Sequence, residues 1–157
     1  MCDKKEDTHP FFKFQLHAVI GNSYFHLQQY PQAENSFSQA LQIRKYLVKV
    51  KSTSKVSESN DITCDVDIKY RIHICYVKMR QNKKALDILQ TVPMRLRDVK
   101  INMALGNLFR DTGYDRQSII CYKEALKENS MALEAAENLL KLGVKVTEER
   151  MLRCLNI

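Results

Sequence analysis

The feature that most constrains the fold is the spacing of glycine and aromatic residues in the segment 100–126. Gly106 precedes Phe109 by three positions, and Tyr122 follows after Gly113. This order predicts two helices joined by a tight turn. Gly106 lets the two backbones approach closely, the two aromatic rings fill the space between the helices, and Gly113 ends the first helix in a left-handed conformation. One such pair cannot bury its apolar face alone, so further copies are expected.

Two further copies of the pattern precede this segment, and the N-terminal one also has the small residues Ala33 and Ala40 in its second helix. The N-terminal copy has Gly21 and Phe37 in the corresponding positions, and His17 stands where the pattern usually has tryptophan. In the middle copy, residues 67–93, His73 fills the position that should be small. The combined spacing is that of the tetratricopeptide repeat, a helix–turn–helix unit of about 34 residues. We therefore predict an all-α tetratricopeptide-repeat solenoid, a right-handed superhelix of antiparallel helix pairs.

The copies also set the expected domain boundaries. We expect a disordered N-terminus and then one repeat domain, interrupted by the stretch KVKSTSKVSESNDITC. Six Ser or Thr and no aromatic residue in this stretch indicate a flexible insertion. The last predicted helix lacks the polar outer face that ends a solenoid, so we expect a fragment or a covered end. The expected segments are 1–9 (disordered), 10–48 (repeat), 49–64 (insertion), 65–94 (repeat), 95–130 (repeat) and 131–157 (partial helix pair), the last five forming one domain over 10–157.

Composition argues against several other classes of protein. No apolar run approaches the roughly 18–20 residues of a membrane helix, and the N-terminal MCDKKEDTHP is charged where a signal peptide would be apolar. The five cysteines are an odd number and contain no CxxC pair, which favours reduced thiols over a metal site. We expect a protein of the nucleus and cytoplasm that has no membrane segment and binds no metal or cofactor.

The net charge of +7 is concentrated in two clusters. Their members are Arg44, Lys45, Lys49, Lys51 and Lys55 in the first, and Lys69, Arg71, Lys78, Arg80, Lys83 and Lys84 in the second. Nucleic-acid binding would require stacking aromatic residues or a groove-reading motif near such charge, and neither is visible. The clusters indicate a solvated basic face or a dock for an acidic protein segment, rather than a nucleic-acid site.

The repeat geometry predicts a binding groove lined by the first helix of each pair. Residues of these helices that face away from their partner helix combine aromatic, apolar and amide side chains, which suits an extended peptide. The predicted groove residues are Asn22, Phe25, His26, Tyr70, Ile74, Val77, Lys100, Met103, Asn107 and Arg110.

Chaperone-binding tetratricopeptide domains hold a C-terminal carboxylate with lysine, arginine and asparagine side chains. At the matching positions this chain has Asn22 and Lys100, which agree, but also Ala18, Arg71 and Ala104, which do not. Losing two cationic partners of the carboxylate weakens the chaperone-adaptor interpretation.

No catalytic motif is present. The chain lacks a phosphate-binding loop and any Ser–His–Asp or Cys–His arrangement. Cys75 and His73 are two residues apart, so on a helix they point to different sides. We predict a protein that is not an enzyme.

Several segments together resemble one family more closely than the repeat pattern alone requires. DVDIKYRIHICY, KKALDILQTVP, KINMALGNLF, YKEAL and LGVK, with the long Ser/Thr-rich insertion, are similar to the N-terminal repeat region of the anaphase-promoting complex subunit 7 family. The resemblance covers about residues 14–157. It implies a non-catalytic, homodimeric scaffold subunit of a cell-cycle ubiquitin ligase, assembled with other tetratricopeptide-repeat subunits.

Two alternatives remain beside this scaffold hypothesis. A free-standing peptide adaptor would be a monomer that binds a short linear motif in the groove. A basic helical repeat that binds nucleic acid would lose affinity steeply with salt.

Overall fold

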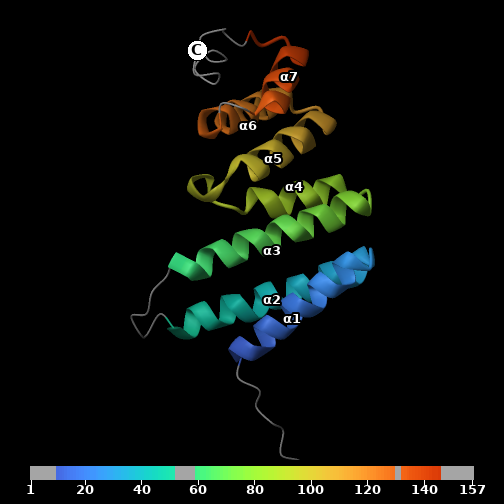
Figure 1. The fold of residues 1–157 in the computed structure, drawn as a ribbon, viewed down its shortest axis with the longest axis vertical. Coiled ribbons are helices and arrows are strands. Elements are labelled where there is room, and N and C mark those ends of the chain that lie inside the picture. Colours follow the sequence, from blue (N-terminus) through green and yellow to red (C-terminus); the bar gives the residue numbers. More distant parts are fainter. Residues whose placement is uncertain (1–9, 52–58, 130–131, 146–157) are drawn as a thin grey trace, which may run out of the picture. The chain divides into compact units, whose positions relative to one another are not determined.

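The computed structural model describes residues 10–51, 59–129 and 132–145, and all regular structure within them is helical (Figure 1). The chain divides into two compact units, 1–81 and 82–157, which are described separately. The first unit contains α1 (Pro10–His26), α2 (Tyr30–Lys51) and α3 (Ser59–Lys78). The second contains α4 (Asn82–Gln90), the 3-10 helix η1 (Met94–Leu96), α5 (Val99–Asp111), α6 (Asp115–Glu128) and α7 (Leu133–Lys141). None of the described helices is long and apolar enough to cross a membrane.

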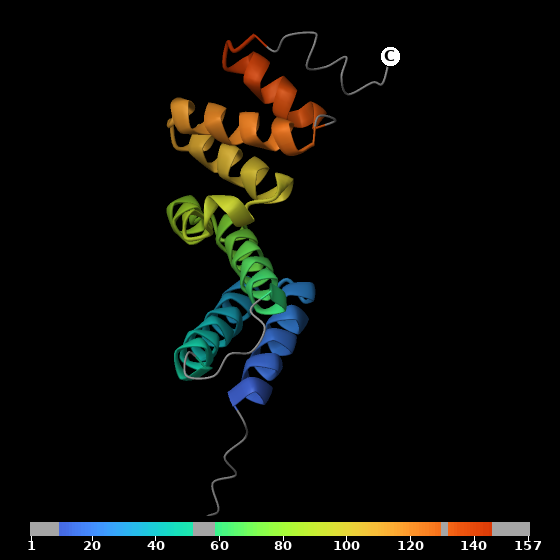
Figure 2. The same ribbon diagram turned by 90° about the vertical axis from the view of Figure 1, so that its left-hand side faces the viewer.

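Helices α1 and α2 lie side by side as the first helix pair (Figure 2). A Cβ atom added at Gly21 of α1 would lie only 2.6 Å from ring carbon Cδ1 of Phe37 on α2. Ala33 and Ala40 of α2 are fully buried, as expected for small residues between closely packed helices. The close approach predicted from Gly21 and Phe37 is therefore confirmed.

Polar contacts join α3 to α2 within the first unit. The Tyr76 hydroxyl of α3 donates to a carboxylate oxygen of Glu34 on α2 at 2.8 Å. Burial, together with this carboxylate, raises the pKa of Tyr76 to about 12. The phenol therefore stays protonated and keeps its donor at neutral pH.

The second α2–α3 contact is an ion pair. Nε of Arg44 lies 3.4 Å from Oδ1 of Asp65, and the guanidinium carbon lies 5.1 Å from the ring centroid of Phe14 on α1. Arg44 is only 4% exposed, so the expectation that its basic run forms a solvated face is wrong for this residue. A carboxylate and an aromatic face compensate the buried cation.

His73 on α3 is buried at the position where the repeat pattern requires a small residue. Its Nδ1–H donates to the backbone carbonyl of Tyr70, and the two rings lie with centroids 4.6 Å apart. Burial lowers the pKa of His73, which keeps the imidazole neutral near pH 7. The local hydrogen bond and the neighbouring ring explain how the fold accommodates this larger side chain.

Helices α5 and α6 form the helix pair of the second unit. A Cβ atom added at Gly106 would lie 2.5 Å from Cε1 of Tyr122, and the buried Ser118 hydroxyl donates to the Gly106 carbonyl at 2.8 Å. Gly113 in the turn has a φ of +80°, the left-handed conformation that favours glycine. The predictions for Gly106, Tyr122 and Gly113 are confirmed.

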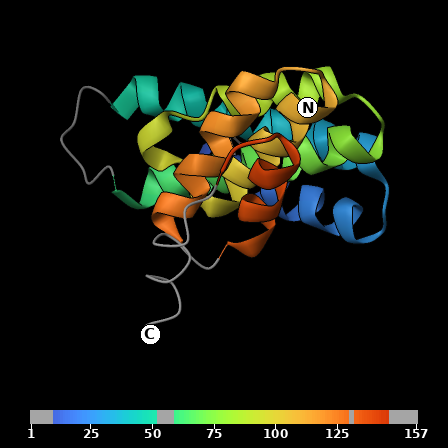
Figure 3. The same ribbon diagram turned by 90° about the horizontal axis from the view of Figure 1, so that it is seen from above.

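Helix α7 packs against α6 in the second unit (Figures 1 and 3). Tyr122 and Ala125 of α6 and Ala135 and Leu139 of α7 form one buried cluster. The small alanines let the two helices approach, so α7 covers the face of α6 that α5 leaves open.

The expected insertion of residues 49–64 is shorter in the structure. Helix α2 continues to Lys51 and α3 already begins at Ser59. The physical reason is visible in the sequence, since Ile43, Leu47 and Val50 continue an apolar stripe at helical spacing. The predictions for residues 1–9, for the middle of the insertion and for a helix after Thr147 fall outside the described residues.

Candidate protein-interaction surfaces

The predicted groove residues of the second unit all lie on α5, which Asp98 caps by accepting a hydrogen bond from the Ile101 amide at 2.9 Å. Three of the four make contacts within the unit. The Asn107 side-chain oxygen accepts from the Tyr122 hydroxyl at 2.6 Å, and Nη1 of Arg110 donates to Oδ1 of Asn138 on α7 at 2.9 Å.

Met103 packs against the buried α6–α7 cluster, while Lys100 is exposed. Three of the four α5 side chains therefore have structural partners that account for their positions. A role of α5 in peptide binding stays a prediction.

The predicted groove residues of the first unit lie on α1 and α3. Phe25 is half-buried, with its ring centroid 5.9 Å from that of Tyr30 in a T-shaped contact. The guanidinium carbon of Arg71 on α3 lies 6.0 Å from the Phe25 ring centroid, so these parts of α1 and α3 are adjacent. Sequence reasoning placed Arg71 only in a basic cluster and at an unmatched clamp position, and it missed this contact.

The remaining groove residues of the first unit differ in exposure. His26 and Val77 are exposed, and Tyr70 and Ile74 are half-buried. The side-chain oxygen of Asn22 is buried and has no hydrogen-bond partner among the described residues. An unpaired buried acceptor is uncommon, so no described hydrogen bond accounts for the position of the Asn22 side-chain oxygen. A groove built from these residues also stays a prediction.

A surface that sequence reasoning missed lies on the outer side of α1. Phe12, Leu16 and Val19 are 57%, 47% and 61% exposed. They are spaced by four and three residues, so they lie on one line along the helix; we call these three residues the α1 apolar ridge. Phe14 and Gly21, on the inner side, are buried. Because α1 is apolar on both sides, periodicity alone could not separate the packed side from the exposed one.

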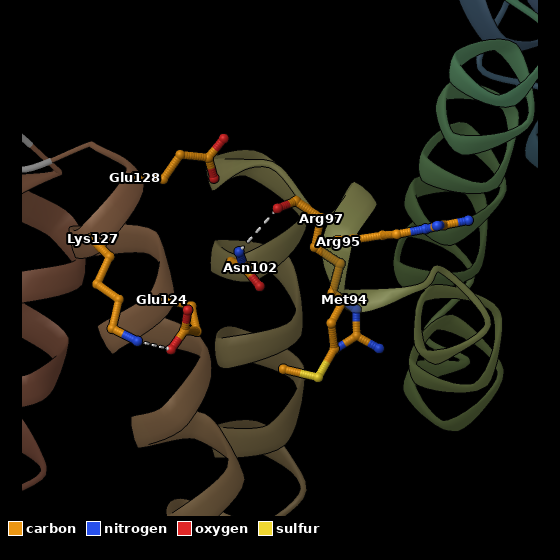
Figure 4. Close-up of a pocket in the computed structure, with 7 residues that line it drawn as sticks. All are labelled: Met94, Arg95, Arg97, Asn102, Glu124, Lys127 and Glu128. Carbon is orange, nitrogen blue, oxygen red and sulfur yellow. Dashed lines mark hydrogen bonds and ion pairs between the residues drawn. The ribbon is translucent and has the colours of Figure 1, made fainter. Parts of the chain in front are cut away.

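The second unit contains a cleft of about 440 Å³ between η1 and the end of α6 (Figure 4). The residues that line it are mostly charged: Met94, Arg95, Arg97, Asn102, Glu124, Lys127 and Glu128. Arg97 donates to the carbonyls of Val92 and Gln90 at 2.9 and 3.2 Å, and the Asn102 amide donates to the Arg97 carbonyl at 3.3 Å. These bonds fix the wall formed by residues 94–97.

The thiols of Cys75 and Cys121 are poorly suited to nucleophilic chemistry. Burial, with the Glu34 charge, raises the pKa of Cys75 to about 11, and burial also raises the pKa of Cys121. Both therefore remain protonated at neutral pH, whereas a reactive cysteine requires the thiolate. Within the described residues, no three His, Cys, Asp or Glu side chains are grouped as a metal site would require.

Comparison with known proteins gives two independent results on the fold. A tetratricopeptide-repeat family model matches residues 99–130, which are α5 and α6. The segment 99–130 is therefore a tetratricopeptide repeat. The chain superposes with a TM-score of 0.63 on a solved structure from Plasmodium falciparum. That structure is the C-terminal TPR-containing domain of a protein classed with the FK506-binding proteins. The superposition covers 87% of this chain and 92% of that domain at 18% identity, which supports the fold alone. The predicted all-α tetratricopeptide-repeat fold is confirmed.

Sequence comparison gives more specific relatives. The chain is 35% identical over 143 residues to human anaphase-promoting complex subunit 7, and 34% identical over 146 residues to the Mus musculus protein of that name. The subunit 7 of Arabidopsis thaliana is 24% identical over 154 residues. These matches cover 87%, 88% and 90% of this tetratricopeptide-repeat chain, but 25%, 26% and 27% of the relatives. The chain thus spans about a quarter of their length, and the resemblance seen in its sequence motifs is confirmed.

Proposed function

We propose that the chain acts as a non-catalytic scaffold subunit of the anaphase-promoting complex, a cell-cycle ubiquitin ligase, in the nucleus and cytoplasm. The observation that carries this proposal is the 35% identity to human subunit 7 over 87% of the chain. The raised thiol pKa values and the repeat fold support a binding role rather than a catalytic one.

Purification of the tagged full-length gene product tests this assignment. We expect other subunits of the anaphase-promoting complex to co-purify at near-stoichiometric amounts, identified by mass spectrometry. A suitable control is the same tag on an unrelated tetratricopeptide-repeat protein. Recovery of the chain without any subunit of the complex would contradict the assignment and favour a free-standing peptide adaptor.

The finer part of the proposal is that the chain forms a homodimer through the α1 apolar ridge. Three large apolar side chains in a line, each about half exposed, form a contiguous apolar strip of the kind that can mark an interaction site. A symmetric dimer is the commonest way to cover such a surface. Because the contact is apolar, its strength should depend only weakly on salt.

Replacing both Leu16 and Val19 by aspartate tests the dimer. Burying each apolar side chain contributes about 1.5–3 kcal/mol, so the double substitution should weaken the dimer by at least about a hundredfold. Sedimentation at micromolar concentration, at low and high salt, measures this. Asn35→Asp introduces an acid at an exposed position of α2 and should leave the dimer intact. A wild-type monomer at all concentrations would refute the dimer, and a dimer lost at high salt would indicate charged contacts.

A further inference from the structure

The outward side of α6 carries a line of cations. Arg116, Ile120, Lys123 and Lys127 are all exposed, and their spacing of four, three and four residues places them on one line along the helix. We call these four residues the α6 basic ridge. The opposite side of the helix is buried, including Ser118, Cys121, Tyr122 and Ala125. Among the described residues, the ridge is therefore the side of α6 that is not used for packing.

The acids of α6 lie beside the ridge rather than on it. At 100° per residue, Asp115 falls on one side of the ridge, and Glu124 and Glu128 fall on the other. Lys127 pairs with Glu124, so that carboxylate neutralises one cation of the ridge. For Arg116 and Lys123 the helix geometry places no acid on the ridge itself.

The C-terminal end of the ridge joins the cleft between η1 and α6. Lys127 belongs to both, and the other wall of the cleft holds Arg95 and Arg97 (Figure 4). Arg97 donates to two backbone carbonyls rather than to a carboxylate, which leaves its positive charge uncompensated by these bonds. Ridge and cleft together carry five cations and the carboxylates of Glu124 and Glu128, an excess of three positive charges.

Two exposed apolar side chains lie among these charged residues. Ile120, in the middle of the ridge, is 54% exposed, and Met94, at the cleft, is 69% exposed. Neither ridge nor cleft presents an aromatic ring on which a base could stack, which disfavours single-stranded nucleic acid. Cations around an apolar residue complement carboxylates around an apolar residue.

We propose that the α6 basic ridge and the adjoining cleft form a docking surface for an acidic segment of a partner protein. Carboxylates of the segment pair with Arg116, Lys123 and Arg95, and an apolar residue of the segment covers Ile120. The inference rests on the proposed role as a protein-interaction subunit and specifies the chemistry of one partner. It concerns α6 and is separate from the α1 apolar ridge.

The test measures binding of a short fluorescein-labelled peptide built only of Glu and Leu, by fluorescence anisotropy at about 0.15 M salt. We expect saturable binding to the isolated chain. Arg116→Glu with Lys123→Glu should weaken it about tenfold, and Ile120→Ser should weaken it about threefold. Lys13→Glu with Lys78→Glu is the matched control, because it changes the net charge equally at exposed positions of the first unit. The control should change affinity by less than about twofold.

Three results would overturn the proposal. The first is no saturable binding of the peptide, and the second is an equal loss in the ridge and control variants. The third is binding that Ile120→Ser leaves unchanged while oligothymidylate competes as well as the peptide, which would identify a general polyanion surface. Because the assay uses the isolated chain, its failure leaves the co-purification test of the scaffold assignment unaffected.

Discussion

Gly106→Leu should lower the free energy of unfolding of the second unit by about 3 kcal/mol, at the upper end of the usual cost of overpacking. A Cβ atom alone would lie 2.5 Å from the ring of Tyr122, which is fully buried and cannot move into solvent. The larger leucine must push α5 and α6 apart. That separation would also break the 2.8 Å hydrogen bond from Ser118 to the Gly106 carbonyl. Thermal and urea unfolding followed by circular dichroism measure the effect.

Two further variants separate this mechanism from a general effect of leucine. Gln117→Leu introduces the same side chain at an exposed position of α6 and should change stability by less than about 0.5 kcal/mol. The double variant Gly106→Ala with Tyr122→Leu should be less destabilised than Gly106→Leu, because it removes the ring that would meet the new Cβ atom. An unchanged unfolding midpoint for Gly106→Leu would mean that the α5–α6 packing described here is wrong.

Local spacing was sufficient to predict the α1–α2 and α5–α6 helix pairs. Gly21 with Phe37, and Gly106 with Tyr122, meet across a pair of neighbouring helices, and Gly113 acts within a single turn. These contacts join residues fewer than twenty positions apart. The repeat spacing determines that such residues face each other across one helix pair. Sequence reasoning therefore identified the fold and the residues at its helix crossings.

Features that depend on more distant or irregular structure could not be predicted in the same way. Arg44 lies in a basic run, and only the positions of Phe14 on α1 and Asp65 on α3 show that it is buried. The cleft in the second unit depends on the η1 segment 94–97, which has no periodic pattern. The α1 apolar ridge escaped detection because the helix is apolar on both sides.

The predicted groove shows that repeat position alone does not identify residues that are available for binding. Repeat geometry placed Asn107 and Arg110 on α5 as binding residues, but their side chains bond to Tyr122 and Asn138. Position along a repeat predicts which helix a residue occupies. It does not predict whether a neighbouring helix already uses the side chain.

The second large effect is expected at the buried ion pair, where Asp65→Asn should lower the free energy of unfolding of the first unit by about 2 kcal/mol. Removing one partner of a fully buried pair costs about 3–5 kcal/mol, because the other charge is left uncompensated. The Asp65 side chain is 33% exposed, so water screens the pair. The expected loss of about 2 kcal/mol is therefore smaller than for a fully buried pair. Arg44 itself is 5% exposed in its side chain and cannot be solvated without moving α1. Urea unfolding measures the change.

A control substitution and a double substitution test whether the loss of the carboxylate charge causes the destabilisation by Asp65→Asn. Asp67→Asn makes the same change at an exposed position of α3, so it should alter stability by less than about 0.5 kcal/mol. Arg44→Met with Asp65→Leu removes both charges and keeps apolar contact with Phe14, so it should be closer to wild type than Asp65→Asn. If Asp65→Asn is no more destabilising than Asp67→Asn, the Asp65 carboxylate is not what compensates the buried charge of Arg44.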